Sequence, residues 1–314
     1  MRLLVTGASG FIGRNVLLRA SRDWEVVAVS HRDASLQTFV GEQGLTNVRV
    51  VQCDLTDADS VKALVKAAGG PIDAVLYLAA NGDPAVSALE PARDLRQNTL
   101  APVTFLEHCT AGHVVYVSSG AVYDGLQGPV SPATPVSPRL PYAISKLASE
   151  QYLRFFCERR ATVGSFINVR FFGAYGPYEA ARKITTRWLS AVAAGQREFV
   201  IRGNGENLID FMYVDDAVDG FLALTKAAGT RATVDFASGT PVSVNEIVQA
   251  MARVAGVDVS VRHEGAVAEY IEFRSADTTM RETYGCVPRV SFDSGLQRLQ
   301  AFLAGGIQAD VRRG

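Results

Sequence analysis

Three residues near the middle of the chain have the types that acid/base chemistry at an alcohol or a carbonyl requires. Tyr142 and Lys146 are four residues apart, so on a helix they share one face. An ammonium beside a phenol favours the phenolate, so we expect Lys146 to lower the pKa of Tyr142 towards a useful range. Ser119 follows an apolar run and offers a hydroxyl to the substrate oxygen. We therefore predict Ser119, Tyr142 and Lys146 as catalytic residues.

A second group, from Thr6 to Gly13, is rich in glycine and lies between an apolar run and a helical segment. Glycines lack Cβ atoms, so the backbone can approach a pyrophosphate, and a helix N-terminus favours its negative charge. The segment predicts a dinucleotide site that would carry out hydride transfer beside the acid/base residues. Its predicted cofactor contacts are Gly7, Ser9, Gly10, Phe11, Ile12 and Gly13.

The end of the second expected strand bears on the choice of dinucleotide. An acidic residue at this place binds the ribose hydroxyls of NAD. Here the chain has Ser30, His31 and Arg32, and a hydroxyl with an arginine suits a ribose phosphate. We therefore favour NADP(H), while NAD(H) stays open because Asp33 could reach the ribose. The alternative for Arg32 is a solvated loop cation.

Asp54 and Leu55 follow the third expected strand and are placed to meet the adenine edge. A helix N-cap role for Asp54 or Thr56 agrees equally well with the sequence.

Strands and helices alternate through the first half of the chain, and these elements must position the residues above. The strand-like runs lack polar alternation, which is typical of parallel strands covered on both faces. The pattern predicts an α/β fold, a Rossmann-type doubly wound parallel sheet with a smaller mixed α/β C-terminal substrate domain. The expected strands are residues 2–5, 25–29, 48–51, 74–78, 114–117 and 162–170, and the expected helices include 57–68 and 142–160.

We place the dinucleotide-binding domain at residues 1–172, with part of 208–240 packing back onto it. Residues 173–314 form the expected smaller substrate-binding domain, and 125–141 reads as a loop rich in Pro, Ser and Gly. The expected helices of the substrate-binding domain are 185–195, 214–226, 244–254 and 294–304, with short strands near 199–202, 233–236 and 257–261.

Composition limits the function classes. Hydrophobic residues make up 48% and charged residues 20% of the 314 residues, with a net charge of −1, as in soluble globular proteins. This balance gives no electrostatic footprint for nucleic acid or an anionic membrane, and no apolar run reaches a membrane-spanning length. The four cysteines are far apart and form no metal-ligand cluster, so we expect reduced thiols and no metal site. We see no leader segment and expect a cytoplasmic protein.

Together these residues resemble the extended short-chain dehydrogenase/reductase family, in particular its nucleotide-sugar epimerases, dehydratases and reductases. Residues 6–13 resemble the T-G-x-x-G-x-x-G loop of that family, and residues 169–177 resemble its segment beside the nicotinamide. Ser119, Tyr142 and Lys146 match its catalytic set, and Asn98 falls where an asparagine braces the active-site helix. The resemblance implies further cofactor contacts at Leu78, Ala79, Ala80, Asn98, Tyr142, Lys146 and Phe172.

Departures from that family bear on the substrate. Its sugar dehydratases carry an Asp-Glu pair where this chain has Gly120 and Ala121, so 4,6-dehydration is not expected. Many nucleotide-sugar enzymes have Asn at the place of Gly173 and Arg at the place of Ile209, both of which contact the diphosphate. Other cations of the substrate half could substitute, although each alone is more often a solvated surface charge. The expected substrate contacts are Asn81, Ser119, Gly120, Gly173, Arg182, Lys183, Arg202 and Arg274.

The resemblance implies a nucleotide-sugar 4-epimerase or 4-ketoreductase. One alternative is an NADP-dependent carbonyl reductase whose substrate lacks a nucleotide diphosphate, and another is a non-catalytic dinucleotide sensor. The resemblance also implies a homodimer that uses the helices near 99–109 and after 142. Leu147, Leu153 and Phe156 are its candidate contacts, unless they face their own sheet.

Overall fold

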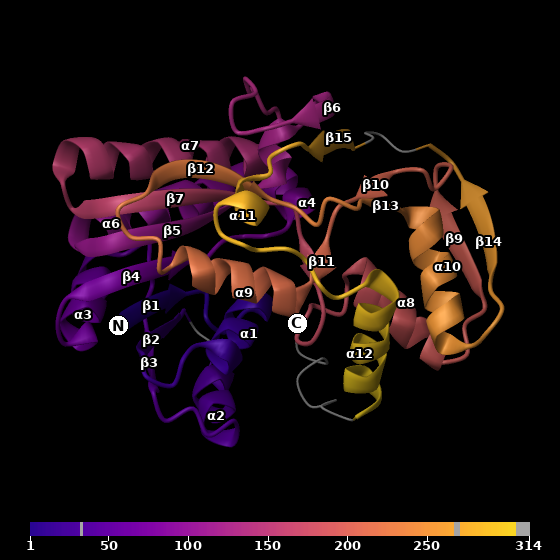
Figure 1. Cartoon of the computed structure of the whole chain (residues 1–314), viewed down its shortest axis with the longest axis horizontal. Coiled ribbons are helices and arrows are strands. Elements are labelled where there is room, and N and C mark those ends of the chain that lie inside the picture. Colours follow the sequence, from indigo (N-terminus) through magenta and orange to yellow (C-terminus); the bar gives the residue numbers. More distant parts are fainter. Residues whose placement is uncertain (32–33, 267–270, 306–314) are drawn as a thin grey trace.

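The computed structural model describes residues 1–31, 34–266 and 271–305 and contains one large parallel sheet (Figure 1). The strand order is β12-β7-β5-β4-β1-β2-β3, and every neighbouring pair is parallel. The chain runs outward from β1 to β3 and then returns to the other side of β1, which confirms the doubly wound α/β prediction. The strands are β1 (Arg2–Thr6), β2 (Glu25–Ser30), β3 (Val48–Gln52), β4 (Ile72–Tyr77), β5 (Ala111–Ser119), β7 (Val163–Phe171) and β12 (Arg231–Phe236).

Helices cover both faces of this sheet (Figure 1). One face carries α1 (Phe11–Arg19), α2 (Ser35–Glu42) and α9 (Val214–Leu224). The other carries α3 (Ala58–Ala68), α6 (Ala101–His108) and α7 (Pro141–Phe155). Successive residues of β1 belong to opposite cores, because Leu3 and Val5 pack on the first face and Leu4 on the second. This two-sided burial explains the absence of polar alternation in the sequence.

The elements after β7 lie mostly to one side of the sheet, whereas β12 and α9 join it (Figure 1). Among the described helices, none has the length and apolar character to cross a bilayer. The elements on this side are α8 (Ile184–Ala193), β9 (Glu198–Arg202), β10 (Leu208–Ile209), β11 (Met212–Tyr213), β13 (Val242–Ser243), α10 (Val244–Ala255), β14 (Ser260–Glu264) and α12 (Phe292–Ala304). The short helix α11 (Thr279–Glu282) packs against β12 instead.

Several elements depart from the sequence expectations. The expected loop at 125–141 contains β6 (Gln127–Val130), which pairs in parallel with β15 (Glu272–Ser275). The strand expected at 257–261 begins only at Ser260. The helix expected over 142–160 ends as a π-helical turn, η3 (Phe156–Arg160). The elements that the sequence did not announce include α4 (Pro84–Leu89), α5 (Pro91–Leu95), the π-helical η1 (Arg96–Leu100), the 3-10 turn η2 (Gly120–Tyr123) and β8 (Ala174–Tyr175).

A buried ion pair joins α7 to the centre of the sheet. Glu150 of α7 and Arg170 of β7 lie 2.9 Å apart, with side chains only 2% and 6% exposed. Ser118 of β5 donates a hydrogen bond of 2.5 Å to the same carboxylate, and Arg170 donates one of 3.0 Å to the hydroxyl of Tyr123. The two charges therefore compensate each other where water is excluded and fix α7 against β5 and β7.

Replacing one partner of this pair should cost far more than replacing both. We expect Arg170→Met to lower the free energy of unfolding by about 3 kcal/mol, because Glu150 would remain charged and buried without a cation. The double variant Glu150→Met/Arg170→Met should lose much less than the sum of the two single variants. Urea denaturation of the four proteins measures this, and strictly additive losses would contradict the account.

Candidate active site

The predicted catalytic residues and the glycine-rich segment meet at the carboxyl edge of the sheet. Ser119 is the last residue of β5, and Tyr142 and Lys146 occupy the first turns of α7. Gly7 follows β1 directly, two strands away from β5 across β4. In doubly wound folds, ligands bind at this edge, beside the point where the strand order reverses.

Ser119, Tyr142 and Lys146 lie together. The side chain of Tyr142 lies close enough to that of Ser119 to interact with it, and the Ser119 hydroxyl oxygen accepts the backbone N–H of Ala121 at 3.1 Å. The Nζ of Lys146 donates to the carbonyl of Val117 at 2.8 Å and lies 6.0 Å from the centre of the Tyr142 ring. A substrate oxygen near Ser119 would therefore meet the phenol of Tyr142 as well.

The protonation behaviour of this group differs from the prediction. Burial raises the pKa of Tyr142, and the nearby hydroxyl of Ser119 opposes that rise only in part. Burial also lowers the pKa of Lys146 to about 8, against the opposing charges of Asp94 and Glu150. The expectation that Lys146 brings the pKa of Tyr142 below its usual value is thus wrong in this structure, because desolvation of the phenol outweighs the other contributions.

The glycine-rich turn forms a cradle that only residues without a Cβ atom can build. A Cβ atom on Gly13 would lie 2.5 Å from the carbonyl oxygen of Gly7, and one on Gly7 would lie 2.9 Å from the backbone nitrogen of Ala79. Helix α1 starts at Phe11 after Gly10, which has no side chain to cap the helix. Its first N–H groups can therefore bind phosphate, and this arrangement fits a dinucleotide pyrophosphate.

The loop after β4 is tied down beside this cradle. The hydroxyl oxygen of Thr6 accepts the backbone N–H groups of Leu78 and Ala79 at 3.0 and 3.1 Å. These two residues are partly buried, as expected for a segment lining a cofactor, and Ala80 is exposed. The turn after β1 and the loop after β4 therefore hold each other in place.

Asn98 of η1 connects that loop to α7. Its side chain, 1% exposed, accepts the backbone N–H of Asn81 at 2.7 Å and donates to the carbonyl of the same residue at 3.1 Å. Ser149 of α7 donates to the Asn98 carbonyl at 2.6 Å. The structure thus gives Asn98 the bracing position that the resemblance implies.

Asn81 itself was predicted to contact substrate, and the structure gives its side chain other partners. The amide group donates to the hydroxyl of Ser87 at 3.0 Å, and the amide oxygen accepts the N–H of Asp83 at 3.2 Å. The first bond ties the loop to α4 and the second lies within the loop, so we interpret the side chain as a structural part of this segment.

The ribose end of the predicted cofactor site is described only in part. Ser30 ends β2 and is buried, and His31 is exposed with its Nε2 atom 3.3 Å from a carboxylate oxygen of Asp54. Arg32 and Asp33 lie outside the described residues. The preference for NADP(H) therefore stays a prediction.

The alternative that Asp54 or Thr56 caps a helix is wrong. The N-cap of α3 is Asp57, whose carboxylate accepts the backbone N–H of Ser60 at 2.9 Å. Asp54 instead accepts the backbone N–H of Thr56 at 2.9 Å in a local turn, and Leu55 is buried. The Asp54 side chain faces His31, which leaves its predicted position at the adenine edge consistent with the structure.

An aromatic ring occupies the space beside Gly120. A Cβ atom on Gly120 would lie 3.1 Å from the ring of Phe172, which also packs near Tyr123 and Phe273. An aspartate at this place would have to displace that ring. Gly173 has φ of +146°, a conformation that an asparagine adopts only with strain. The backbone here therefore suits the residues present better than those of the related dehydratases and diphosphate sites.

The predicted substrate cations are spread over the structure. Arg182 reaches the loop after β4, where its Nε lies 3.1 Å from a carboxylate oxygen of Asp83. Lys183 is exposed at the N-cap of α8, and Arg274 is exposed on β15, the strand beside β6. Arg202 ends β9, which pairs with β14 at the far end of the molecule from β5 (Figure 1). No contact between Arg202 and Ser119 is found among the described residues, and the role of Arg202 at the substrate stays a prediction.

Sequence reasoning missed the buried charges around these residues. Glu150 lies four residues after Lys146, so it continues the face of Tyr142 and Lys146 along α7. That spacing was a usable signal. Asp94 of α5 is fully buried four residues before Asn98, and a lone aspartate in a short polar stretch gave no such indication.

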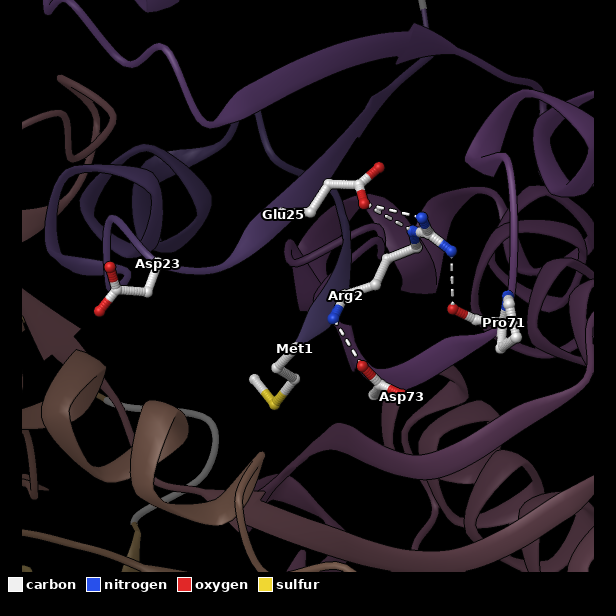
Figure 2. A pocket seen from close by; sticks show the side chains of 6 residues that line it. All are labelled: Met1, Arg2, Asp23, Glu25, Pro71 and Asp73. Carbon is white, nitrogen blue, oxygen red and sulfur yellow. Dashed lines mark hydrogen bonds and ion pairs between the residues drawn. The ribbon is translucent and has the colours of Figure 1, made fainter.

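A shallow hollow of about 430 Å³ lies at the opposite, amino edge of the sheet (Figure 2). The guanidinium of Arg2 at its centre is bound to Glu25 at 2.7 Å and to the carbonyl of Pro71 at 3.1 Å. The backbone N–H of Arg2 donates to Asp73 at 2.7 Å. These neighbouring residues already bind the polar groups of Arg2, and β5 ends at the opposite edge of the sheet. We therefore do not assign the active site to this hollow.

The fold and the cradle define an enzyme of the extended short-chain dehydrogenase/reductase type. The chain belongs to the NAD dependent epimerase/dehydratase family, whose model matches residues 3–235.

Individual relatives narrow the comparison. The UDP-glucose 4-epimerase of Mycolicibacterium smegmatis is 28% identical over 313 residues, which cover 96% of this chain and 98% of that enzyme. A dTDP-glucose 4,6-dehydratase of Mycobacterium tuberculosis is 33% identical over 232 residues, 69% of this chain. The match spans 66% of that dehydratase, slightly less than two thirds. The solved structure of MoeE5 in complex with UDP-glucose and NAD has a TM-score of 0.84 and 28% identity, covering 97% of this chain and 99% of that one.

The cradle predicts a large effect of one methyl group. Gly13→Ala should weaken binding of NADH and NADPH at least about tenfold, because the new Cβ atom would press on the carbonyl of Gly7. Gly41→Ala is the matched control, since Gly41 lies in α2 with open space around it and should keep the affinity of the unchanged protein. Fluorescence titration of both variants measures this, and equal affinities would refute the cradle.

Proposed function

We propose that this protein is a nucleotide-sugar 4-epimerase that works with a nicotinamide dinucleotide. The observation that carries the proposal is the grouping of Ser119, Tyr142 and Lys146 at the same sheet edge as the glycine cradle. Similarity to a UDP-glucose 4-epimerase over nearly the whole of both chains supports this reaction. The likeness to MoeE5 with UDP-glucose and NAD supports the substrate class.

Tyr142, Ser119 and Lys146 each have a role in this chemistry. Tyr142 takes the proton of the sugar 4-hydroxyl and gives it back at the end of the cycle, and Ser119 holds the same oxygen by a hydrogen bond. Lys146 keeps a positive charge beside the phenol and binds the nicotinamide ribose. A nicotinamide dinucleotide held at the glycine cradle would supply the reversible hydride transfer at C4 that an epimerase needs. The protein thereby contributes position and electrostatics.

Dehydration of the sugar does not fit this site, although a relative catalyses it. The Asp-Glu pair of such enzymes corresponds here to Gly120 and Ala121, and the ring of Phe172 fills the space beside Gly120. Gly173 and Ile209 likewise lack the side chains that hold a diphosphate in many relatives. These two positions favour, as the alternative, an NADP-dependent carbonyl reductase whose substrate lacks a nucleotide diphosphate.

An NADP-linked 4-ketoreductase is the second candidate, and the sequence Ser30-His31-Arg32 favours it. The dinucleotide released on denaturation of the purified protein separates the two. Firmly bound NAD supports an epimerase that regenerates its own cofactor. An empty site that prefers NADPH over NADH supports the reductase and would contradict the epimerase proposal.

Removal of one hydroxyl tests the proposed role of Tyr142. We expect Tyr142→Phe to lower kcat for interconversion of UDP-glucose and UDP-galactose by about 10²- to 10⁴-fold, while dinucleotide affinity stays near that of the unchanged protein. Tyr152→Phe makes the same change on an exposed tyrosine of the same helix and should leave kcat unchanged. Unaltered turnover in Tyr142→Phe would remove this residue from the mechanism.

The lowered pKa of Lys146 gives the expected pH dependence. Because burial lowers the pKa of Lys146 to about 8, its positive charge is present below that pH and is lost as the pH rises through it. We therefore expect kcat of the unchanged protein, measured in the same interconversion assay, to decline as the pH rises, with a midpoint near pH 8.

We also propose that two copies associate through α7 and its neighbours. The candidate contacts Leu153 and Phe156 are buried against their own sheet, and Leu147 is partly buried, so the prediction chose the wrong side of the helix. The large apolar side chains exposed on α5, η1 and α7 are Leu95, Leu100, Ile144, Tyr152 and Phe155.

A charge on that face should separate the copies. We expect Phe155→Arg to give a monomer at concentrations where the unchanged protein is a dimer, because burial of an unpaired guanidinium is unfavourable. Val200→Arg, on an equally exposed apolar residue of β9, should leave the dimer intact. Sedimentation equilibrium reads the masses, and a monomeric unchanged protein would refute the assembly.

A further inference from the structure

Asp94 of α5 is a buried carboxylate with an incomplete set of partners. Its side chain is 0% exposed. One carboxylate oxygen accepts hydrogen bonds from the Ser87 hydroxyl at 2.5 Å and from the Asn98 amide at 2.6 Å. The other oxygen, Oδ2, has no hydrogen-bond partner among the described residues. A buried charge in this state needs an opposite charge nearby to offset its desolvation.

The other buried carboxylate near the site, Glu150, has such a charge. Arg170 binds it at 2.9 Å and Ser118 adds a hydrogen bond. Within the described residues, no ion pair of this kind joins Asp94 to an arginine. The charge of Asp94 instead acts on Lys146, whose pKa it raises against the lowering by burial.

Lys146 is a suitable counter-ion because it is buried, whereas the other lysines of the chain are exposed. The chain has five lysines, of which Lys62, Lys66, Lys183 and Lys226 are exposed and Lys146 is 3% exposed. The titratable groups that face Lys146 are Asp94 from α5, Glu150 and Tyr142 from its own helix, and Tyr116 from β5, whose ring centre lies 5.0 Å from Nζ. Since Arg170 already neutralises Glu150, Asp94 is the carboxylate whose charge is left for Lys146.

We propose that Asp94 is a positioning residue of the active site, the buried counter-charge that holds Lys146 in its ammonium form beside Tyr142. Through Asn98 it also fixes the loop after β4. The consequence for turnover rests on the epimerase function proposed above, whereas the coupling of the two charges does not.

The two roles of Asp94 can be separated by substitution. Asp94→Asn keeps the size of the side chain and an oxygen that can accept from Ser87 and Asn98, but it removes the charge. Ser87→Ala is the matched control, because it removes one hydrogen bond to Asp94 and leaves the charge in place. Only the first variant should change the protonation of Lys146.

Nuclear magnetic resonance of the full-length protein, as purified and labelled with ¹³C only at lysine, tests this directly. Five signals are expected, and Lys146→Arg identifies the buried one. In Asp94→Asn the titration midpoint of Lys146 should fall by roughly one pH unit relative to the unchanged protein, while Ser87→Ala should leave it in place. A midpoint that is the same in Asp94→Asn and in the unchanged protein would overturn the proposal. Because no substrate is added, failure to convert any nucleotide sugar would not affect this result.

A stability cycle gives the answer if Asp94→Asn folds poorly. Lys146→Gln leaves Asp94 without its counter-ion, so adding Asp94→Asn should raise the melting temperature of Lys146→Gln. A double variant that melts at or below the temperature of Lys146→Gln alone would overturn the proposal.

Discussion

The buried ion pair between Glu150 and Arg170 is the interaction on which the arrangement of this site depends. It joins the middle of α7 to β7, and its hydrogen bond with Ser118 reaches the residue before Ser119. Tyr142 and Lys146 lie on the same helix as Glu150 and on the same face. The pair therefore fixes the distance between the end of β5, which carries the hydroxyl, and the helix, which carries the phenol and the ammonium. An apolar contact would hold α7 to the sheet without fixing its rotation and register in this way.

The same low-dielectric surroundings govern the chemistry. Burial raises the pKa of Tyr142 and lowers that of Lys146, so each group is pushed towards its neutral form. The carboxylates of Asp94 and Glu150 near Lys146 oppose that tendency, because both raise the pKa of the lysine. The glycine cradle adds the partial positive charge of a helix N-terminus at the same edge of the sheet.

Much of this arrangement was predictable from local patterns. The apolar strand runs, the glycine turn and the spacing of Tyr142 and Lys146 report short-range constraints, and the doubly wound sheet follows from them. Other features depend on residues that meet only in the folded chain. Strand β6 exists because β15 pairs with it from far along the sequence, and its own residues include Gly128 and Pro129. The raised pKa of Tyr142 and the burial of Asp94 likewise follow from packing.

In the proposed reaction, a hydride leaves the sugar carbon C4 and returns to it, while Tyr142 takes up and releases the hydroxyl proton. Turnover of UDP-glucose carrying deuterium at C4 tests it most directly. The account predicts UDP-galactose that retains the deuterium at C4, formed more slowly than from the unlabelled sugar. UDP-galactose that has lost this deuterium to solvent hydrogen would contradict it. A rate of product formation that is the same for the labelled and the unlabelled sugar would also contradict it.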